Sequence, residues 1–311
     1  MSLGSVDMSV EKIIGDIRSE FMDRQPMRAK SLIITLFGDV VSQHDKEIWL
    51  GSLIHALEPL GVNERLVRTS VFRLVKEGWL SVEREGRRSF YQLTAFGGQE
   101  YQRAAQRIYA SQGEEWRGRW QILLPVNVPD ELREDFKRSL NWLGFRAISP
   151  GTFARPGGDA ASIRDVLDEF NLRDGVIVMD AETNAVTTKQ DLKATINHHW
   201  ALDQLADSYG NFIEQFKPLL QALDKARQPS AANAFHGRLL LIHEYRRTLL
   251  RDTSLPEDLL PSQWPGKTAR SMVARIYKHL QKPSLDYIKS ELISRQGHLP
   301  NPSKAFFERF E

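Results

Sequence analysis

The stretch from Ile48 to Gly97 constrains the fold of this chain more than any other. Apolar residues recur at helical spacing over residues 48–60 and predict a helix there. Gly61 suits the left-handed position that ends a helix, because it has no Cβ. Asn63 is placed to cap a second helix by accepting a hydrogen bond from an amide near Leu66. The sequence therefore predicts two helices joined by a tight turn.

The second helix is predicted from Glu64 to Glu77, and its two faces differ. Val67, Val71 and Leu74 fall on one side, where they can seat the helix on a core. The opposite side is rich in cationic and hydroxyl groups, which suit the phosphates and base edges of DNA. The candidate groove contacts are Arg65, Arg68, Thr69, Arg73 and Lys76. Phe72 shares this outer side, where it can touch a thymine methyl group or pack against the segment that follows.

A β-hairpin is expected directly after the second helix. Apolar residues alternate over 79–82 and again over 90–93, with a turn near Glu85 and Gly86. The tip carries the arginines Arg84, Arg87 and Arg88. Such a tip can be merely solvated, but beside a cationic helix it is placed to meet the DNA backbone or minor groove. Helix, turn, helix and hairpin in this order predict a winged helix-turn-helix, a DNA-binding module.

Composition limits the alternatives. With 311 residues, the chain is long enough for two or three domains. A net charge of +2 is too small for a generally basic protein, so any affinity for nucleic acid has to come from a local patch such as the one above. The absence of cysteine excludes disulfides, thiolate zinc sites and cysteine nucleophiles, and suits a cytoplasmic protein. No apolar run reaches membrane-spanning length, so we expect no membrane partner.

The first part of the chain is expected to hold an arm and the DNA-binding domain. Residues 1–25 are polar and mixed in charge, which indicates a flexible N-terminal arm. Residues 26–111 are assigned to the winged helix-turn-helix domain. It is led by a helix at 26–41 and followed by an exit helix at 94–111, which Thr94 can cap.

The later parts differ in pattern. Residues 112–188 alternate strands and helices in the order βαββαβ, or a truncated form of it, which predicts a ferredoxin-like domain. Residues 189–311 are helical and rich in Leu, Phe and Tyr, and we expect a helical C-terminal domain whose last residues fray. Its first helix, at 192–223, can break near Gly210 or Pro218. The predicted fold class is α+β in three domains.

Several short segments resemble one known family. Those of the first part include EIWLGS at 47–52 and GRRSFY at 86–91, and those of the last part include LLIH at 240–243. The further matching positions are 64–69, 72–74, 77–80, 245–247, 255–256, 259–261, Trp264, Gly266, Ala269 and Arg270. Over residues 31–277 the chain thus resembles the PaaX-type family of phenylacetate-operon transcriptional repressors.

This resemblance implies a homodimeric repressor of genes for aromatic-acid breakdown. Such a repressor binds double-stranded operator DNA and is released from it by an acyl-coenzyme A, typically phenylacetyl-CoA. The resemblance also implies a middle domain similar in fold to a small CRISPR-associated nuclease. Here the strand at 121–126 ends at Asn127 and offers no carboxylate for a metal, so nuclease activity is not expected.

An acyl-CoA effector needs cations for its phosphates beside an apolar slot for its acyl group. Residues 189–311 would then serve as the effector and dimerisation domain. The candidate effector-binding residues are Tyr245, Arg246, Arg247, Trp264, Lys267 and Arg270. A solvated face or a second DNA contact are the alternatives for this basic group.

Sequence patterns for nucleotide binding, metal binding or catalysis are weak in this chain. Gly266-Lys267-Thr268 ends like a phosphate-binding loop, but Pro261 stands where that loop needs a glycine. His236 and His243 fall on one helical face and could ligate a metal, although buried, hydrogen-bonded histidines are the favoured interpretation. We expect no catalytic residue, metal or cofactor. The alternatives to a repressor are a winged-helix protein-interaction scaffold and, less favoured, a nucleic-acid-processing enzyme that uses the ferredoxin-like domain.

Overall fold

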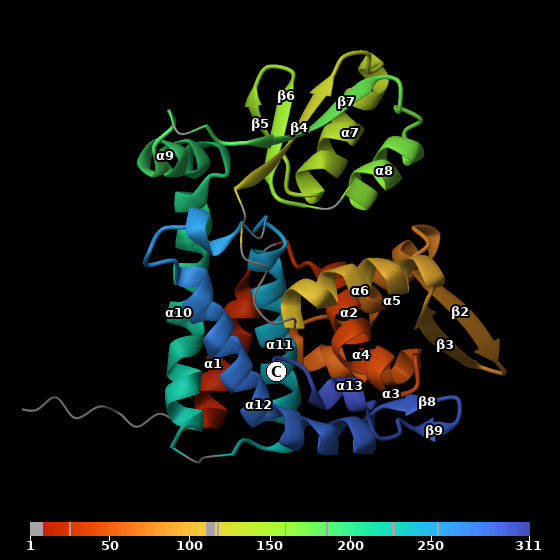
Figure 1. Cartoon of the computed structure of the whole chain (residues 1–311). Helices are drawn as coiled ribbons and strands as arrows, with labels where there is room; N and C mark the ends of the chain where they lie inside the picture. Colours follow the sequence, from red (N-terminus) through yellow and green to blue (C-terminus); the bar gives the residue numbers. More distant parts are fainter. Residues whose placement is uncertain are drawn as a thin grey trace, which may run out of the picture. The chain divides into compact units, whose positions relative to one another are not determined.

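The computed structural model describes residues 9–24, 26–109, 116, 118–158, 160–184, 186–225, 228–253 and 255–311. The chain is a mixture of helices and antiparallel sheets and folds as two compact units (Figure 1). Unit 1 combines residues 1–111, 209–249 and 266–311, and unit 2 combines residues 112–208 and 250–265. Each unit therefore contains segments that are far apart in the sequence.

Unit 1 contains a packed helix where a flexible arm was predicted for residues 1–25. Helix α1 (Val10–Asp23) is capped by the side chain of Ser9 and packs along α11 (Ala231–Leu249). Its buried residues are Val10, Ile13, Ile14, Ile17 and Phe21. They form one apolar stripe at helical spacing, which outweighs the polar composition of the segment. The expectation of a flexible arm is therefore wrong over the length of α1.

The helical segment after α1 packs closely against the helix that carries Tyr101. Helix α2 (Ala29–Leu36) continues into the wider π-type turn η1 (Phe37–Val41) and the short helix α3 (Ser42–His44). A Cβ on Gly38 would lie 1.7 Å from a ring carbon of Tyr101. Only glycine leaves room for that ring, so this position ties η1 to the helix that carries Tyr101.

The predicted helix pair follows, with the expected turn. The elements are β1 (Glu47–Trp49), α4 (Leu50–Leu57), η2 (Glu58–Leu60) and α5 (Glu64–Lys76). Gly61 is left-handed, with φ of 75°, and Asn63 accepts a hydrogen bond from the Leu66 amide at 2.9 Å. Both predictions for this turn are confirmed.

The predicted hairpin is also present. Strands β2 (Leu80–Glu85) and β3 (Arg88–Leu93) pair antiparallel, and β1 pairs with the other edge of β3, so the sheet order is β1-β3-β2. Thr94 caps helix α6 (Ala95–Tyr109) by accepting a hydrogen bond from the Gly97 amide at 3.0 Å, as predicted.

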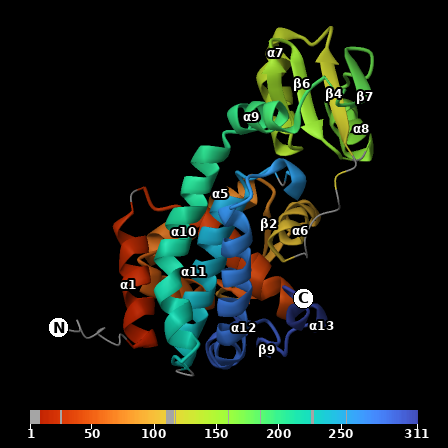
Figure 2. The same ribbon diagram turned by 60° about the vertical axis from the view of Figure 1, so that its left-hand side comes forward.

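Long C-terminal helices complete unit 1. Helix α10 (Leu202–Leu223), which belongs to unit 1 from Tyr209 on, lies beside α1, and α12 (Pro265–Glu291) lies beside α11 (Figure 2). The C-terminal helices thus share a unit with the N-terminal elements, which differs from the separate helical domain expected at 189–311. Instead of fraying, the last residues form β8 (Ile293–Ser294), β9 (Gly297–His298) and α13 (Lys304–Phe307).

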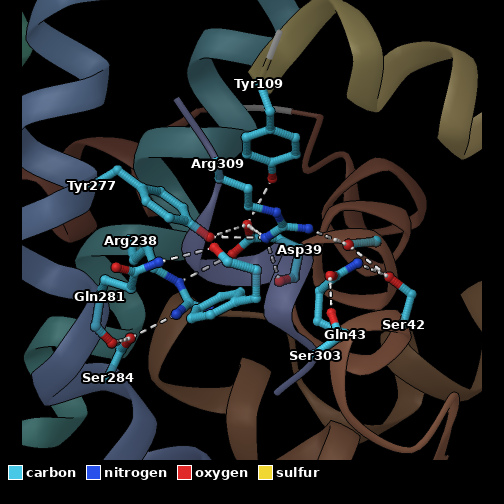
Figure 3. Close-up of polar contacts among 12 residues, drawn as sticks. Asp39, Ser42, Gln43, Tyr109, Arg238, Tyr277, Gln281, Ser284, Ser303 and Arg309 are labelled. Carbon is cyan, nitrogen blue, oxygen red and sulfur yellow. Dashed lines mark hydrogen bonds and ion pairs between the residues drawn. The ribbon is translucent and has the colours of Figure 1, made fainter. Parts of the chain in front are cut away.

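A buried ionic cluster joins these helices at η1 (Figure 3). Asp39 is fully buried and accepts hydrogen bonds from Arg238 at 3.1 Å, Arg309 at 2.8 Å, Tyr109 at 2.6 Å and Tyr277 at 3.1 Å. The donors come from α11, the residues after α13, α6 and α12. One carboxylate therefore ties four distant segments of unit 1 together.

Unit 2 is built on a four-stranded antiparallel sheet of order β5-β6-β4-β7. In chain order its elements are β4 (Arg119–Pro125), α7 (Asp130–Trp142), β5 (Arg146–Ser149), β6 (Thr152–Pro156), α8 (Ala160–Glu169) and β7 (Val176–Glu182). Helices α7 and α8 cover one face of the sheet (Figure 1). The core between them includes Leu123, Phe136, Leu140 and Leu167.

Unit 2 also holds α9 (Lys189–His199) and the short turn η3 (Glu257–Leu259). The helix predicted over 192–223 is divided between α9 and α10 at Ala201, whose φ is 50°, and not at Gly210 or Pro218.

Among the described residues, no helix combines the length and apolar character needed to cross a membrane.

Candidate nucleic-acid interface

Helix α5 has a cationic outer face, whereas its inner face packs on the core of unit 1. Val67, Val71 and Leu74 are buried, and the helix packs against α2. The exposed side chains of its outer face are Arg65, Arg68, Thr69, Phe72, Arg73 and Lys76. The five groove contacts predicted on this helix therefore share one exposed surface.

The polar groups on this face are bonded to different extents. The guanidinium of Arg68 is paired with Glu64 one turn earlier at 2.7 Å. The hydroxyl of Thr69 donates a hydrogen bond to the Arg65 carbonyl at 2.8 Å, so it can meet a base only as an acceptor or through its methyl group. The other cations of the face form no ion pair with a described residue. They can approach phosphates without breaking an existing pair.

The β2–β3 hairpin carries the three predicted wing arginines at its exposed end. Gly86 and Arg87 form the turn between Glu85 and Arg88, and Gly86 adopts a φ of 57°. The guanidinium of Arg88 packs over the ring of Trp49 at 5.0 Å. The exposed arginines of the tip are Arg84, Arg87 and Arg88. This end of the hairpin and the outer face of α5 are the two cationic surfaces of the candidate interface.

An arginine from the C-terminal β8–β9 hairpin pairs with three carboxylates of the β1-β3-β2 sheet. Arg295 lies between β8 and β9, 2.7 Å from Glu83, 3.3 Å from Glu47 and 3.9 Å from Glu85. The hydrogen bond to Glu83, with the charges of the other two carboxylates, raises the pKa of Arg295. Sequence reasoning missed this residue, because no local pattern reports a contact across 212 positions.

The β8–β9 hairpin is itself attached to α4 through Ser52. This side chain is 3% exposed, donates a hydrogen bond to the Glu291 carbonyl at 3.2 Å and accepts one from the Ile293 amide at 3.0 Å. A single buried hydroxyl thus joins the end of α12 to the first helix of the candidate DNA-binding pair. Arg295 therefore lies on a hairpin that is attached to α4 by these hydrogen bonds.

The predicted effector residues on α11 lie in different environments. Tyr245 is 1% exposed, and its ring packs against Phe212 at 5.7 Å. Arg246 is also buried, and its guanidinium reaches the Ser31 hydroxyl at 3.4 Å. Burial lowers the pKa of Arg246. These two residues belong to the core of unit 1.

The other predicted effector residues are spread over both units. Arg247 is more exposed and pairs with Glu244 at 3.3 Å. Lys267 and Arg270 lie in the first two turns of α12 in unit 1, whereas Trp264 is buried in unit 2. The effector-binding role of this set stays a prediction.

The two histidines of α11 are buried and hydrogen-bonded. His236 donates from Nε2 to the Ala56 carbonyl at 3.1 Å, and His243 shares a hydrogen bond with the Thr35 hydroxyl at 3.3 Å. Burial lowers the pKa of His236 to about 4 and, with the charge of Arg246, that of His243 to about 3. Within the described part of the chain, no group of three or more potential ligands could hold a metal ion.

Comparison with known proteins identifies three family models along the chain. The model "PaaX-like protein" matches residues 28–97, the model "PaaX protein central Cas2-like domain" matches residues 113–193, and the model "PaaX-like protein C-terminal domain" matches residues 200–290. The transcriptional repressor PaaX of Escherichia coli (strain K12) is 40% identical over 286 residues, which cover 92% of this chain and 90% of that protein.

A solved structure shares the fold. The uncharacterized protein Rv0674 from Mycobacterium tuberculosis superposes with a TM-score of 0.51 at 19% identity. The match covers 80% of this chain and 94% of that one. At this identity the likeness concerns the fold alone.

Proposed function

The chain belongs to the PaaX-like protein family, and we propose that it is a sequence-specific DNA-binding transcriptional repressor of genes for aromatic-acid breakdown, phenylacetate above all. The observation that carries the proposal is the exposed cationic face of α5 together with the arginine tip of the β2–β3 hairpin. Cationic side chains on the exposed face of a packed helix and at the tip of a hairpin can bind the phosphate backbone of DNA. Other side chains of the same helix can then contact base edges.

In this proposal the first part of unit 1 is a winged helix-turn-helix. Helices α4 and α5 with the turn between them form the helix-turn-helix, and the β2–β3 hairpin is the wing. Helix α5 enters the major groove. The proposed DNA contacts are Arg65, Arg68, Thr69, Arg73, Lys76, Arg84, Arg87 and Arg88. In unit 2, the order β4-α7-β5-β6-α8-β7 and the antiparallel sheet support a ferredoxin-like interpretation.

We further propose that the repressor acts as a homodimer. One α5 helix reads only a few base pairs, too few to select an operator among genomic sites. Two copies related by a twofold axis read two half-sites about one helical turn, or a multiple of it, apart. A palindromic operator follows from this arrangement.

The proposed effector is an acyl-CoA, with phenylacetyl-CoA as the first candidate. Lys267 and Arg270 near the start of α12 supply cations for its phosphates. The effector weakens operator binding only by the difference between its affinities for the DNA-competent and the DNA-incompetent arrangement. A ligand that binds both arrangements equally has no effect on the repressor.

The test is binding of the full chain to duplexes from the DNA upstream of its own gene, at a fixed physiological salt concentration. We expect one duplex to bind about 10³-fold or more tightly than unrelated DNA. Phenylacetyl-CoA, but not free coenzyme A, should abolish that preference. Specific binding that no acyl-CoA changes would support the repressor proposal and contradict the proposed effector. Equal, weak binding to all duplexes would contradict the repressor itself.

A further inference from the structure

Phe72 is a large apolar side chain in the middle of the polar face of α5. It is 69% exposed, whereas the apolar residues of the inner face, such as Val71 and Leu74, are at most 1% exposed. No ring contact joins Phe72 to an aromatic residue of the described chain. The side chain therefore contributes little to the core, and phenylalanine is a poorer helix former than leucine or lysine.

The neighbours of Phe72 define the partner that this face fits. At helical spacing, Arg68 and Thr69 lie one turn before Phe72 and Lys76 lies one turn after it, and Arg73 is the next residue in the chain. All four are exposed. A partner must therefore be anionic around its edge and offer a small apolar group at its centre. An apolar protein pocket of matching size would instead have to carry a ring of acidic residues.

Duplex DNA has this chemistry in its major groove. The groove is lined by phosphates, and its only apolar group is the C5-methyl group of thymine. Polar neighbours cannot read that methyl group by hydrogen bonding, and Thr69 already donates its hydroxyl hydrogen to the Arg65 carbonyl. The ring of Phe72 is thus the side chain of this face best suited to the methyl group.

We propose that Phe72 is a specificity-determining residue that packs against a thymine methyl group in each half-site of the operator. The inference rests on the proposed function, because it requires α5 to lie in the major groove. It adds a chemical statement about the DNA: each half-site contains a T·A pair at which the methyl group, and not the hydrogen-bonding edge, is recognised.

Deoxyuridine tests this directly, because it lacks only the methyl group of thymidine. The probe is the tightest-binding duplex selected by the full chain from a random pool, with each thymine in turn replaced by deoxyuridine. At one thymine per half-site, binding should weaken by about 3- to 10-fold, as expected for one desolvated methyl group packed on a ring. Replacement at other thymines should change little.

Variants then assign the effect to the side chain. Phe72→Ala should bind the unmodified duplex more weakly by a similar factor and should lose its response to deoxyuridine at that one position. Phe72→Leu, which keeps an apolar side chain, should retain part of the response. The matched control is Phe307→Ala, since Phe307 is a half-exposed phenylalanine on α13. That variant should show the full deoxyuridine penalty.

Three outcomes overturn the inference. If the chain prefers one sequence but no thymine responds to deoxyuridine, the repressor proposal stands and the role of Phe72 is wrong. If Phe72→Ala keeps the same deoxyuridine penalty, another residue reads the methyl group. If the chain selects no sequence at all, the proposed function fails together with the inference.

Discussion

Arg309 and Asp39 form a buried ion pair of 2.8 Å across 270 residues of sequence. A second arginine, Arg238, reaches the other carboxylate oxygen at 3.1 Å. Burial alone would raise the pKa of Asp39, but the two guanidinium groups and the hydroxyls of Tyr109 and Tyr277 lower it below its ordinary value. The carboxylate is therefore charged in the folded protein and pairs with two buried cations.

Asp39→Asn should be strongly destabilising. The change leaves Arg238 and Arg309 buried without a counter-charge, and removing one partner of a buried pair costs about 3–5 kcal/mol. The measurement is the free energy of unfolding in urea at pH 7. Glu308→Gln is the control, because it removes the exposed pair with Lys304 in the same C-terminal segment. Exposed pairs contribute about 1 kcal/mol or less. Equal losses for the two variants would contradict a structural role for Asp39.

The same carboxylate predicts a loss of stability in strong acid. Its folded pKa lies below the unfolded value of about 3.9. The stabilisation is therefore complete above that unfolded pKa and is lost as the pH falls through the lower folded value. The urea midpoint of the native protein should decrease more steeply below pH 4 than that of Asp39→Asn. Parallel decreases would show that Asp39 does not titrate on unfolding.

The buried histidines predict a second pH dependence at milder acidity. The pKa values of about 4 for His236 and about 3 for His243 lie below the unfolded value of about 6.5. Below pH 6.5 the unfolded chain binds protons that the folded chain does not, so stability falls with pH. By linkage, each histidine lowers the free energy of unfolding by about 2 kcal/mol between pH 8 and pH 5.

His243→Gln should remove about half of that decrease, because glutamine does not titrate but can keep a hydrogen bond to Thr35. The exposed His298 on β9 provides the control variant His298→Gln. Urea unfolding at several pH values between 8 and 5 measures the slope. An unchanged slope in His243→Gln would mean that this histidine is not buried in its neutral form.

The tip of the hairpin should contribute ionic contacts to DNA binding. Replacing Arg87 and Arg88 with alanine should weaken binding to all duplexes and reduce the slope of log K against log salt by about 1 for each lost phosphate contact. Arg103→Ala is the control, since Arg103 is an exposed arginine on α6 that pairs with Glu100. Unchanged DNA binding in the double variant, with loss of a protein partner, would favour the interaction scaffold.

Local signals in the sequence predicted the local structure well. The cap at Asn63, the left-handed Gly61, the hairpin and the cap at Thr94 all depend on residues within a few positions of each other, and the structure has them. The cationic outer face of α5 follows in the same way from helical periodicity.

Contacts between segments that are distant in the sequence could not be predicted from local sequence patterns. The partners of Asp39 lie on four segments, and nothing in the neighbourhood of Asp39 indicates that two arginines and two tyrosines meet it. The packing of α1 on α11 was missed for a related reason, because a short apolar stripe in a polar segment becomes a buried helix only when a partner helix covers it. Arg295 is the third case, and it bears on the candidate interface itself.

Arg295 should strengthen DNA binding without touching DNA. Glu83 and Glu85 would repel phosphates near the β2–β3 hairpin, and Arg295 offsets part of this charge by pairing with them at 2.7 Å and 3.9 Å. Arg295→Ala should therefore weaken operator binding by about 3- to 10-fold at low salt, with a smaller loss at high salt, where exposed charges are screened. Adding Glu83→Gln and Glu85→Gln to Arg295→Ala should restore most of the affinity, because the repulsive charges are gone. If the triple variant binds as weakly as Arg295→Ala, the arginine acts by holding the hairpin in place, and the electrostatic account is wrong.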